Sequence, residues 1–179
     1  MSAPARAFLD ALDAGGPAAD RAQNMDLYGW LVGSWELDVV GYPENGPQRR
    51  RPGEWHFGWV LEGRAIQDVW IVPSRRARGP GEIVENGFYG TTLRVYDPRI
   101  DAWHIQWTDP VSQTYFTMVG RKQGETIVQE GKGAGANPIR WSFSDIAPKS
   151  FRWRGEVSAD GGATWRLNVE FFARRVETG

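Results

Sequence analysis

Cysteine is absent from this chain of 179 residues, and histidine is nearly so. Without thiols the protein cannot form disulfide bonds, thiolate zinc sites or a cysteine nucleophile. The two imidazoles, His56 and His104, are too few for a three-histidine metal site, and we predict no metal or other cofactor. The missing cysteines also suit a reducing compartment, so we expect a cytoplasmic protein.

Two further absences narrow the class of protein. No apolar run approaches the roughly 18 residues that a membrane span needs, and the first thirty residues lack the apolar core of a secretory signal. Neither sign of charge is in excess, because 21 basic residues are matched by 22 acidic ones and the pI is near 6.1. A domain that binds nucleic acid is usually basic. We therefore expect neither a membrane nor a nucleic acid as partner.

Aromatic residues are abundant by contrast: they make up 13% of the sequence and include ten tryptophans. From Ser34 onward apolar and polar residues alternate with a period of two, and turn residues such as Asp97-Pro98 separate the alternating segments. This pattern predicts ten strands, at 34–41, 53–61, 64–72, 88–97, 102–108, 113–121, 125–131, 139–144, 150–158 and 164–174.

The first thirty residues follow the period of a helix instead. Residues 3–14 place apolar side chains on one stripe, and a second short segment starts at Pro17. A chain of this length fits one domain. We divide it into a helical segment at 1–32, which closes the base of the β-structure, and the β-structure itself at 33–176.

The connections determine how the strands assemble. None is long enough for a crossover helix, so neighbouring strands are expected to pair antiparallel. An open sheet of ten strands would leave two unpaired edges, and closure into a barrel removes both. We therefore predict an all-β fold, a ten-stranded antiparallel up-and-down barrel with a short N-terminal helical segment.

The loops of such a barrel alternate between its two ends. The longest loops, 42–52 and 73–87, fall at the same end, and they carry arginine clusters at 49–51 and 75–78. Long loops are often functional, and the mouths of barrels are common binding sites. We expect a ligand to enter the barrel here, where the arginines could attract an anionic group.

Three short motifs resemble known sequences. Gly33-Ser34-Trp35 is a Gly-x-Trp motif at the place where lipocalins and their calycin relatives carry one. The segment Trp59-Val60-Leu61-Glu62-Gly63-Arg64 is similar to a hairpin of a bacterial family of lipocalin-like proteins, the domain of unknown function 1579, and residues 89–97 also resemble that family. The resemblance covers about 27–174. It implies a calycin-type β-barrel in a bacterial protein, without an established activity.

The lipocalin resemblance also implies a partner for Trp35. In lipocalins the tryptophan of the motif packs at the closed end of the barrel against an arginine from the end of the last strand. Arg174 is the residue that matches this arginine.

One face of the strands carries most of the indoles, and this face is expected to point into the barrel. Two alternatives remain for it: a packed core, or a lumen with free volume for one small ligand. The alternation does not decide which face of 64–72 and of 113–121 points inward. The candidate ligand-binding residues are Trp55, Trp59, Asp68, Trp70, Trp103, Trp107, Tyr115, Trp141 and Trp153.

These residues favour the binding of a small, largely apolar molecule, with an anionic group as an option, in an aromatic-lined lumen. The alternative is an enzyme, an isomerase, cyclase or hydrolase-like catalyst that uses Asp68 or Tyr115 as acid or base. A third hypothesis is a homodimer that forms through an exposed face of the sheet.

Overall fold

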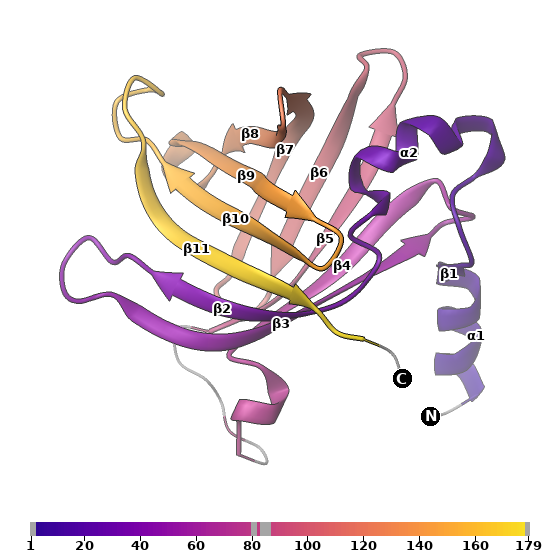
Figure 1. Cartoon of the computed structure of the whole chain (residues 1–179), viewed down its shortest axis with the longest axis horizontal. Helices are drawn as coiled ribbons and strands as arrows, with labels where there is room; N and C mark the ends of the chain where they lie inside the picture. Colours follow the sequence, from indigo (N-terminus) through magenta and orange to yellow (C-terminus); the bar gives the residue numbers. More distant parts are fainter. Residues whose placement is uncertain (1–2, 80–81, 83–86, 178–179) are drawn as a thin grey trace.

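The computed structural model describes residues 3–79, 82 and 87–177, and its main body is a closed β-barrel (Figure 1). Each long strand pairs antiparallel with its neighbours in the sequence, and the pairing of β11 with β2 closes the ring. The predicted ten-stranded up-and-down barrel is therefore confirmed. Its strands are β2 (Gly33–Gly41), β3 (Arg49–Val60), β4 (Ala65–Val72), β5 (Phe88–Asp97), β6 (Ala102–Asp109), β7 (Thr114–Gln123), β8 (Thr126–Lys132), β9 (Pro138–Ala147), β10 (Ser150–Val157) and β11 (Arg166–Arg175).

The strand at the first arginine cluster begins earlier than the alternation predicts. β3 starts at Arg49, because residues 49–51 pair with the end of β2, from Gly41 to Val39. The first arginine cluster therefore lies on a strand, and the loop before it is shorter than expected. The second long loop, 73–87, holds a 3-10 turn at Arg75–Ala77, while its residues 80–81 and 83–86 lie outside the described part of the chain.

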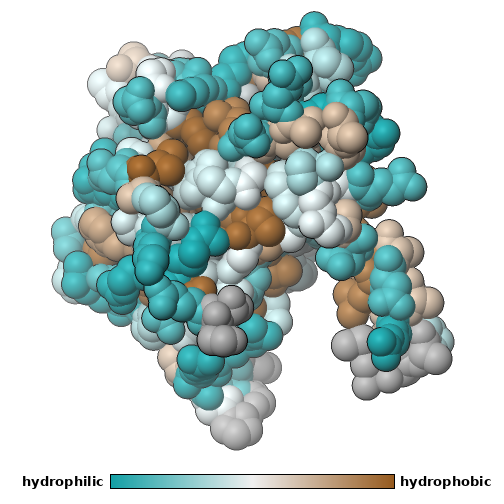
Figure 2. Space-filling model, turned by 45° about the vertical axis from the view of Figure 1, so that its right-hand side comes forward, coloured by the Kyte–Doolittle hydropathy of each residue, from teal (hydrophilic) through white to brown (hydrophobic). Residues whose placement is uncertain are grey.

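Two helices precede the barrel, and they lie in different places (Figures 1 and 2). α1 (Ala3–Leu12) stands apart from the strands, with Phe8 and Leu9 exposed, and leads into a two-residue strand, β1 (Asp13–Ala14), which pairs with the end of β3. α2 (Ala22–Gly29) lies across one end of the barrel. Within the described residues, neither helix is long and apolar enough to cross a membrane.

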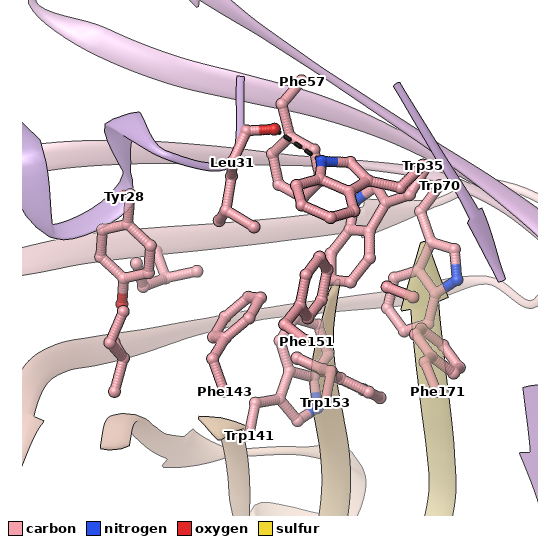
Figure 3. Packing of buried hydrophobic residues seen from close by; sticks show 14 of the residues in the cluster. Tyr28, Leu31, Trp35, Phe57, Trp70, Trp141, Phe143, Phe151, Trp153 and Phe171 are labelled. Carbon is pink, nitrogen blue, oxygen red and sulfur yellow. Dashed lines mark hydrogen bonds between the residues drawn. The ribbon is translucent and has the colours of Figure 1, made fainter. Parts of the chain in front are cut away.

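The packing of α2 defines what is here called the α2 end of the barrel. Met25, Tyr28 and Leu31 are fully buried and belong to the same apolar cluster as the strands. The indole of Trp35 donates a hydrogen bond of 2.7 Å to the carbonyl of Leu31 (Figure 3). Gly29 is small enough to rest on the indole of Trp59, since a Cβ there would lie 2.9 Å from that ring. The end of the helical segment is thus fixed to the barrel.

The arginine that packs on Trp35 is Arg175. Its guanidinium carbon lies 4.1 Å from the centroid of the Trp35 ring, and it donates hydrogen bonds to the carbonyls of Val32 (2.9 Å) and Pro148 (3.1 Å). Arg174 is exposed, so its assignment as the lipocalin-type arginine is wrong by one residue. The reason is strand parity, since the buried apolar residues of β11 lie at 169, 171 and 173 and the residue at 175 continues that face.

Gly63, in the β3–β4 hairpin, anchors the N-terminal segment. Its carbonyl accepts a hydrogen bond of 3.0 Å from the amide of Ala18, and its φ is +72°. A Cβ at this position would lie 2.2 Å from the carbonyl oxygen of Gly16. Only glycine fits both the backbone conformation and the close approach of residues 16–18.

This close approach predicts a difference between two glycines of similar conformation. Gly63→Ala should destabilise the protein by about 2 to 4 kcal/mol, because it adds a clash with a neighbouring backbone to the strain of a positive φ. Gly124→Ala is the matched control, since its φ is +61° and nothing lies within 4 Å of its Cβ position. It should cost about 1 kcal/mol. Urea denaturation of both variants measures this, and equal losses would contradict the anchoring role.

Candidate functional site

At the end of the barrel opposite α2, aromatic rings fill the interior. Trp70 is at the centre of this cluster, with ring centroids 4.7 Å from Trp107, 5.1 Å from Trp153 and 4.8 Å from Phe171 (Figure 3). Trp55 lies 5.4 Å from Trp70 in a stacked arrangement. Five predicted lumen residues belong to this packed layer: Trp55, Trp70, Trp107, Trp141 and Trp153.

The arginines at those loops are engaged on the outer surface. Arg50 pairs with Asp38 at 3.3 Å, and Arg75 pairs with Glu54 at 3.0 Å. Partial burial acts to raise the pKa of Glu54, but hydrogen bonds from Arg75 and His56 lower it to about 2. These contacts hold the guanidinium groups against the barrel wall. The expectation that the two clusters frame an anion-binding mouth is therefore not supported.

Tyr115 does not point inward. Its side chain is 57% exposed, and its hydroxyl donates a hydrogen bond of 3.0 Å to the side chain of Gln113. The inward face of β7 carries Phe116, Met118 and Gly120 instead. The expectation that Tyr115 lines the lumen is wrong, because the alternation of this strand has the opposite phase.

Asp68 does point inward, and the open question about the face of β4 is thereby settled. Its side chain is fully buried and forms an ion pair with Arg94 of β5, which is fully buried as well. The second carboxylate oxygen accepts a hydrogen bond of 3.0 Å from the backbone amide of Thr92. Burial raises the pKa of Asp68, and the charge of Arg94 opposes this rise. One carboxylate oxygen of Asp68 thus binds Arg94, and the other binds the backbone of β5.

Arg94 was not among the predicted site residues, although the sequence contained a signal for it. Gly90, Thr92, Arg94 and Tyr96 share one face of β5, and Thr92 and Arg94 are the polar members with no exposed surface. A carboxylate on an apolar face needs a partner, and neighbouring strands are the nearest source of one. The unpaired Asp68 of the sequence could therefore have pointed to this arginine.

Three buried side chains form what we call the interior polar cluster: Tyr28 of α2, Arg94 of β5 and Gln129 of β8. The guanidinium carbon of Arg94 lies 5.5 Å from the centroid of the Tyr28 ring. Burial raises the pKa of Tyr28, while the charge of Arg94 and the side chain of Gln129, which lies within reach of the Tyr28 hydroxyl, oppose this. Among the described residues, no hydrogen-bond partner is found for Arg94 Nε and Nη2.

A cleft of about 890 Å³ opens beside α2, on the same side as the polar cluster. Its floor includes Trp103, Gly120 and Ile127, which are interior positions of β6, β7 and β8. Gly120 brings the cleft close to the cluster, because a Cβ there would lie 2.4 Å from the Tyr28 hydroxyl. The remaining lining residues are Gln23, Asn24, Asp26, Leu27, Trp30, Tyr96, Asp101, Arg121, Lys122, Glu125, Asp145 and Ile146.

The seven indoles among the predicted site residues therefore fall into two groups. Trp103 borders the cleft, and Trp59 lies under Gly29 at the same end, whereas the other five indoles belong to the packed layer. Both histidines lie on the outer face of the barrel, hydrogen-bonded to Glu54 and Asp97. Within the described residues, no three His, Asp or Glu side chains gather as a metal site would require.

Comparison with solved structures shows that the chain shares its fold with known proteins. Rv2717c from M. tuberculosis superposes with a TM-score of 0.62 at 15% identity, over 87% of this chain and 99% of that one. The S-type phycobiliprotein lyase CPES from Guillardia theta superposes with a TM-score of 0.57 at 9% identity, over 91% and 100%. No family model and no curated protein matches the sequence, so the resemblance to the domain of unknown function 1579 is not confirmed.

The buried ion pair makes a prediction about stability. Arg94→Met should cost about 3 to 5 kcal/mol, because it leaves the carboxylate of Asp68 buried without a cation. Adding Asp68→Leu to that variant should recover at least about 2 kcal/mol, since the unpaired charge is then removed. Urea denaturation of the two single variants and the double variant tests this. A double variant that shows the full sum of both losses would contradict the pairing.

Proposed function

We propose that the protein binds a small, largely apolar molecule in the cleft at the α2 end of the barrel. The carrying observation is the cleft itself, whose apolar and aromatic lining includes Leu27, Trp30, Trp103, Ile127 and Ile146. Its volume of about 890 Å³ lies within the range of roughly 300 to 1,000 Å³ that is usual for small-molecule sites. At the opposite end of the barrel the described indoles pack against one another, with Trp70 and Trp107 4.7 Å apart.

The lining also favours an aromatic or cyclic body over a flexible chain. Trp30 is partly exposed and lines the cleft, and rings of this kind stack on planar ligands, while Trp103 is buried beneath the cleft. The indole of Trp30 is held by a hydrogen bond of 2.9 Å to the carbonyl of Leu27, so this wall is ordered before a ligand binds. An ordered wall reduces the entropy that binding must overcome.

The compartment, the cofactors and the type of partner are proposed from the sequence. A bacterial, cytoplasmic protein without metal or cofactor, whose partner is a small hydrophobic molecule, remains our proposal. The likeness to a phycobiliprotein lyase supports the barrel scaffold, and we transfer no activity from it at 9% identity. An enzyme that uses Asp68 or Tyr115 receives no support, because the first is fixed in an ion pair and the second is exposed.

A matched pair of substitutions tests the location of the site. Ile146 lines the cleft and is 39% exposed, while Val69 is 37% exposed on the outer face of β4. Ile146→Glu should weaken ligand binding at least about tenfold, because a carboxylate in an apolar wall must be desolvated. Val69→Glu should leave binding unchanged.

The measurement is tryptophan fluorescence, titrated with alkylbenzenes, aromatic amides, and aromatic and fatty carboxylates. The proposal expects saturable quenching by at least one class of compound, with Trp30 and Trp103 as reporters. Two results would refute it: no saturable response from any class, or equal responses of the Ile146→Glu and Val69→Glu variants.

A further inference from the structure

We infer that the ligand of the cleft carries a positively charged amino group, and that Asp101, with Asn24 beside it, binds this group. This inference rests on the proposed function and specifies the polar part of its ligand. Asn24 of α2, Tyr96 of β5 and Asp101 of the β5–β6 turn all line the cleft, and hydrogen bonds join them into one array. The cleft and its aromatic lining locate the ligand, and this array specifies its polar end.

The carboxylate of Asp101 fixes the direction of the hydrogen bonds in the array. A carboxylate only accepts, so the Tyr96 hydroxyl donates its one hydrogen to Asp101 Oδ1, at 2.8 Å. The Tyr96 oxygen then accepts from Asn24 Nδ2, at 3.1 Å. No other hydrogen bond to the side chains of Asn24 and Asp101 is found among the described residues. Two acceptor oxygens, Asp101 Oδ2 and Asn24 Oδ1, are therefore left against a single N–H of Asn24.

A primary ammonium group matches these free acceptors. It carries three N–H donors and no acceptor, and it brings the charge that balances a carboxylate. Hydrogen bonds with an ionised partner are about twice as strong as neutral ones. A carboxylate or a carbonyl on the ligand would bring acceptors to acceptors, and a hydroxyl would bring one donor without charge.

The side of the cleft formed by α2 and the β5–β6 turn has no cation of its own to neutralise it. Arg99 of the same turn is bound to Asp97, with Nη2 and Nε at 2.7 and 2.9 Å from its carboxylate oxygens. α2 adds a second carboxylate to the lining, that of Asp26. Within the described residues, no ion pair of Asp26 or Asp101 is found. A cation on the ligand would supply the missing charge.

The charges of the whole lining add up in the same direction. The acidic lining residues are Asp26, Asp101, Glu125 and Asp145, and the basic ones are Arg121 and Lys122. Asp145 lies 4.0 Å from Arg152, which is outside the lining. Even when Asp145 is counted as neutralised, three carboxylates are set against two cations. A cleft lined by an excess of one charge attracts ligands of the opposite charge, and here these are cations.

Trp30 adds aromatic surface that suits the same ligand. Its only N–H donates to the carbonyl of Leu27, so the indole offers ring surface and no free donor to the cleft. The face of an indole attracts cations and also packs on apolar groups. An amine with an apolar body therefore finds matching chemistry on both the aromatic and the acidic parts of the lining.

Three probes of similar shape separate the possible ligand chemistries: 4-propylbenzylamine, 4-propylbenzyl alcohol and 1-ethyl-4-propylbenzene. They share an apolar body and end in an ammonium, a hydroxyl or a methyl group at pH 7. We expect the wild-type protein to bind the amine at least about fivefold more tightly than either of the other two, because only the amine adds charge-assisted hydrogen bonds. Tryptophan fluorescence follows all three titrations.

Two variants then assign the ammonium group to the array. Asp101→Asn removes the charge and keeps the turn, since the φ of Asp101 is +45° and asparagine tolerates this conformation well. Asn24→Leu removes the second acceptor with little change in volume. Asp101→Asn should lower the ratio of amine to hydrocarbon affinity about fivefold or more, and Asn24→Leu about twofold. Asp10→Asn is the matched control, because Asp10 is exposed on α1 and does not line the cleft.

The outcomes distinguish the two levels of the proposal. If none of the probes binds, the cleft is not a site for such molecules and the proposed function fails. If the alcohol and the hydrocarbon bind and the amine binds no more tightly, the function stands and the positive charge is refuted. The inference also fails if Asp101→Asn and Asn24→Leu leave the ratio of amine to hydrocarbon affinity as high as Asp10→Asn does, because the preference then comes from the overall charge of the protein.

Discussion

Closure of ten strands into one ring is the constraint on which the rest of this structure depends. A ring of this size encloses a fixed interior that side chains or a ligand must fill, since proteins tolerate few empty spaces. Seven of the ten tryptophans are buried and help to fill this interior. At the end opposite α2, Trp70 packs against its aromatic neighbours. Towards the α2 end the wall carries Arg94, Gln129 and Gly120 instead, and a separate segment inserts Tyr28 between them.

The sequence predicted the barrel well because its information is local. A period of two marks a strand, and β5 was placed at 88–97, the bounds that the structure shows. The face of each strand that points into the barrel was harder to predict, because a strand with apolar residues on both faces has no preferred side. Tyr115 and Arg174 were each assigned one position out of register, although the alternation of β11 from Val169 onward already contained the right answer for the second.

The location of the candidate site could not be predicted in the same way. Loop lengths indicated the end with more irregular chain, but they carry no information on how rings pack beneath the loops. Whether Trp70 and Trp153 leave a cavity depends on ring angles and distances across the barrel, which are tertiary properties. The ion pairs of the arginine clusters were equally hard to foresee, because partners such as Asp38 and Glu54 lie elsewhere in the sequence and meet the arginines only in the folded barrel.

Tyr28 comes from α2 and not from a strand, so it is held in the interior polar cluster differently from Arg94 and Gln129. The strands hold Arg94 and Gln129 rigidly, since both belong to the continuous ladder of the barrel. Tyr28 is held by the packing of a helix of eight residues, by the attachment of the preceding chain at Gly63, and by the hydrogen bond from Trp35 to Leu31 just after the helix. Hydrogen-bonded ladders open less readily than short terminal segments. The interior polar cluster therefore joins two side chains that the ladder of strands holds in place to a third that the packing of a helix holds in place.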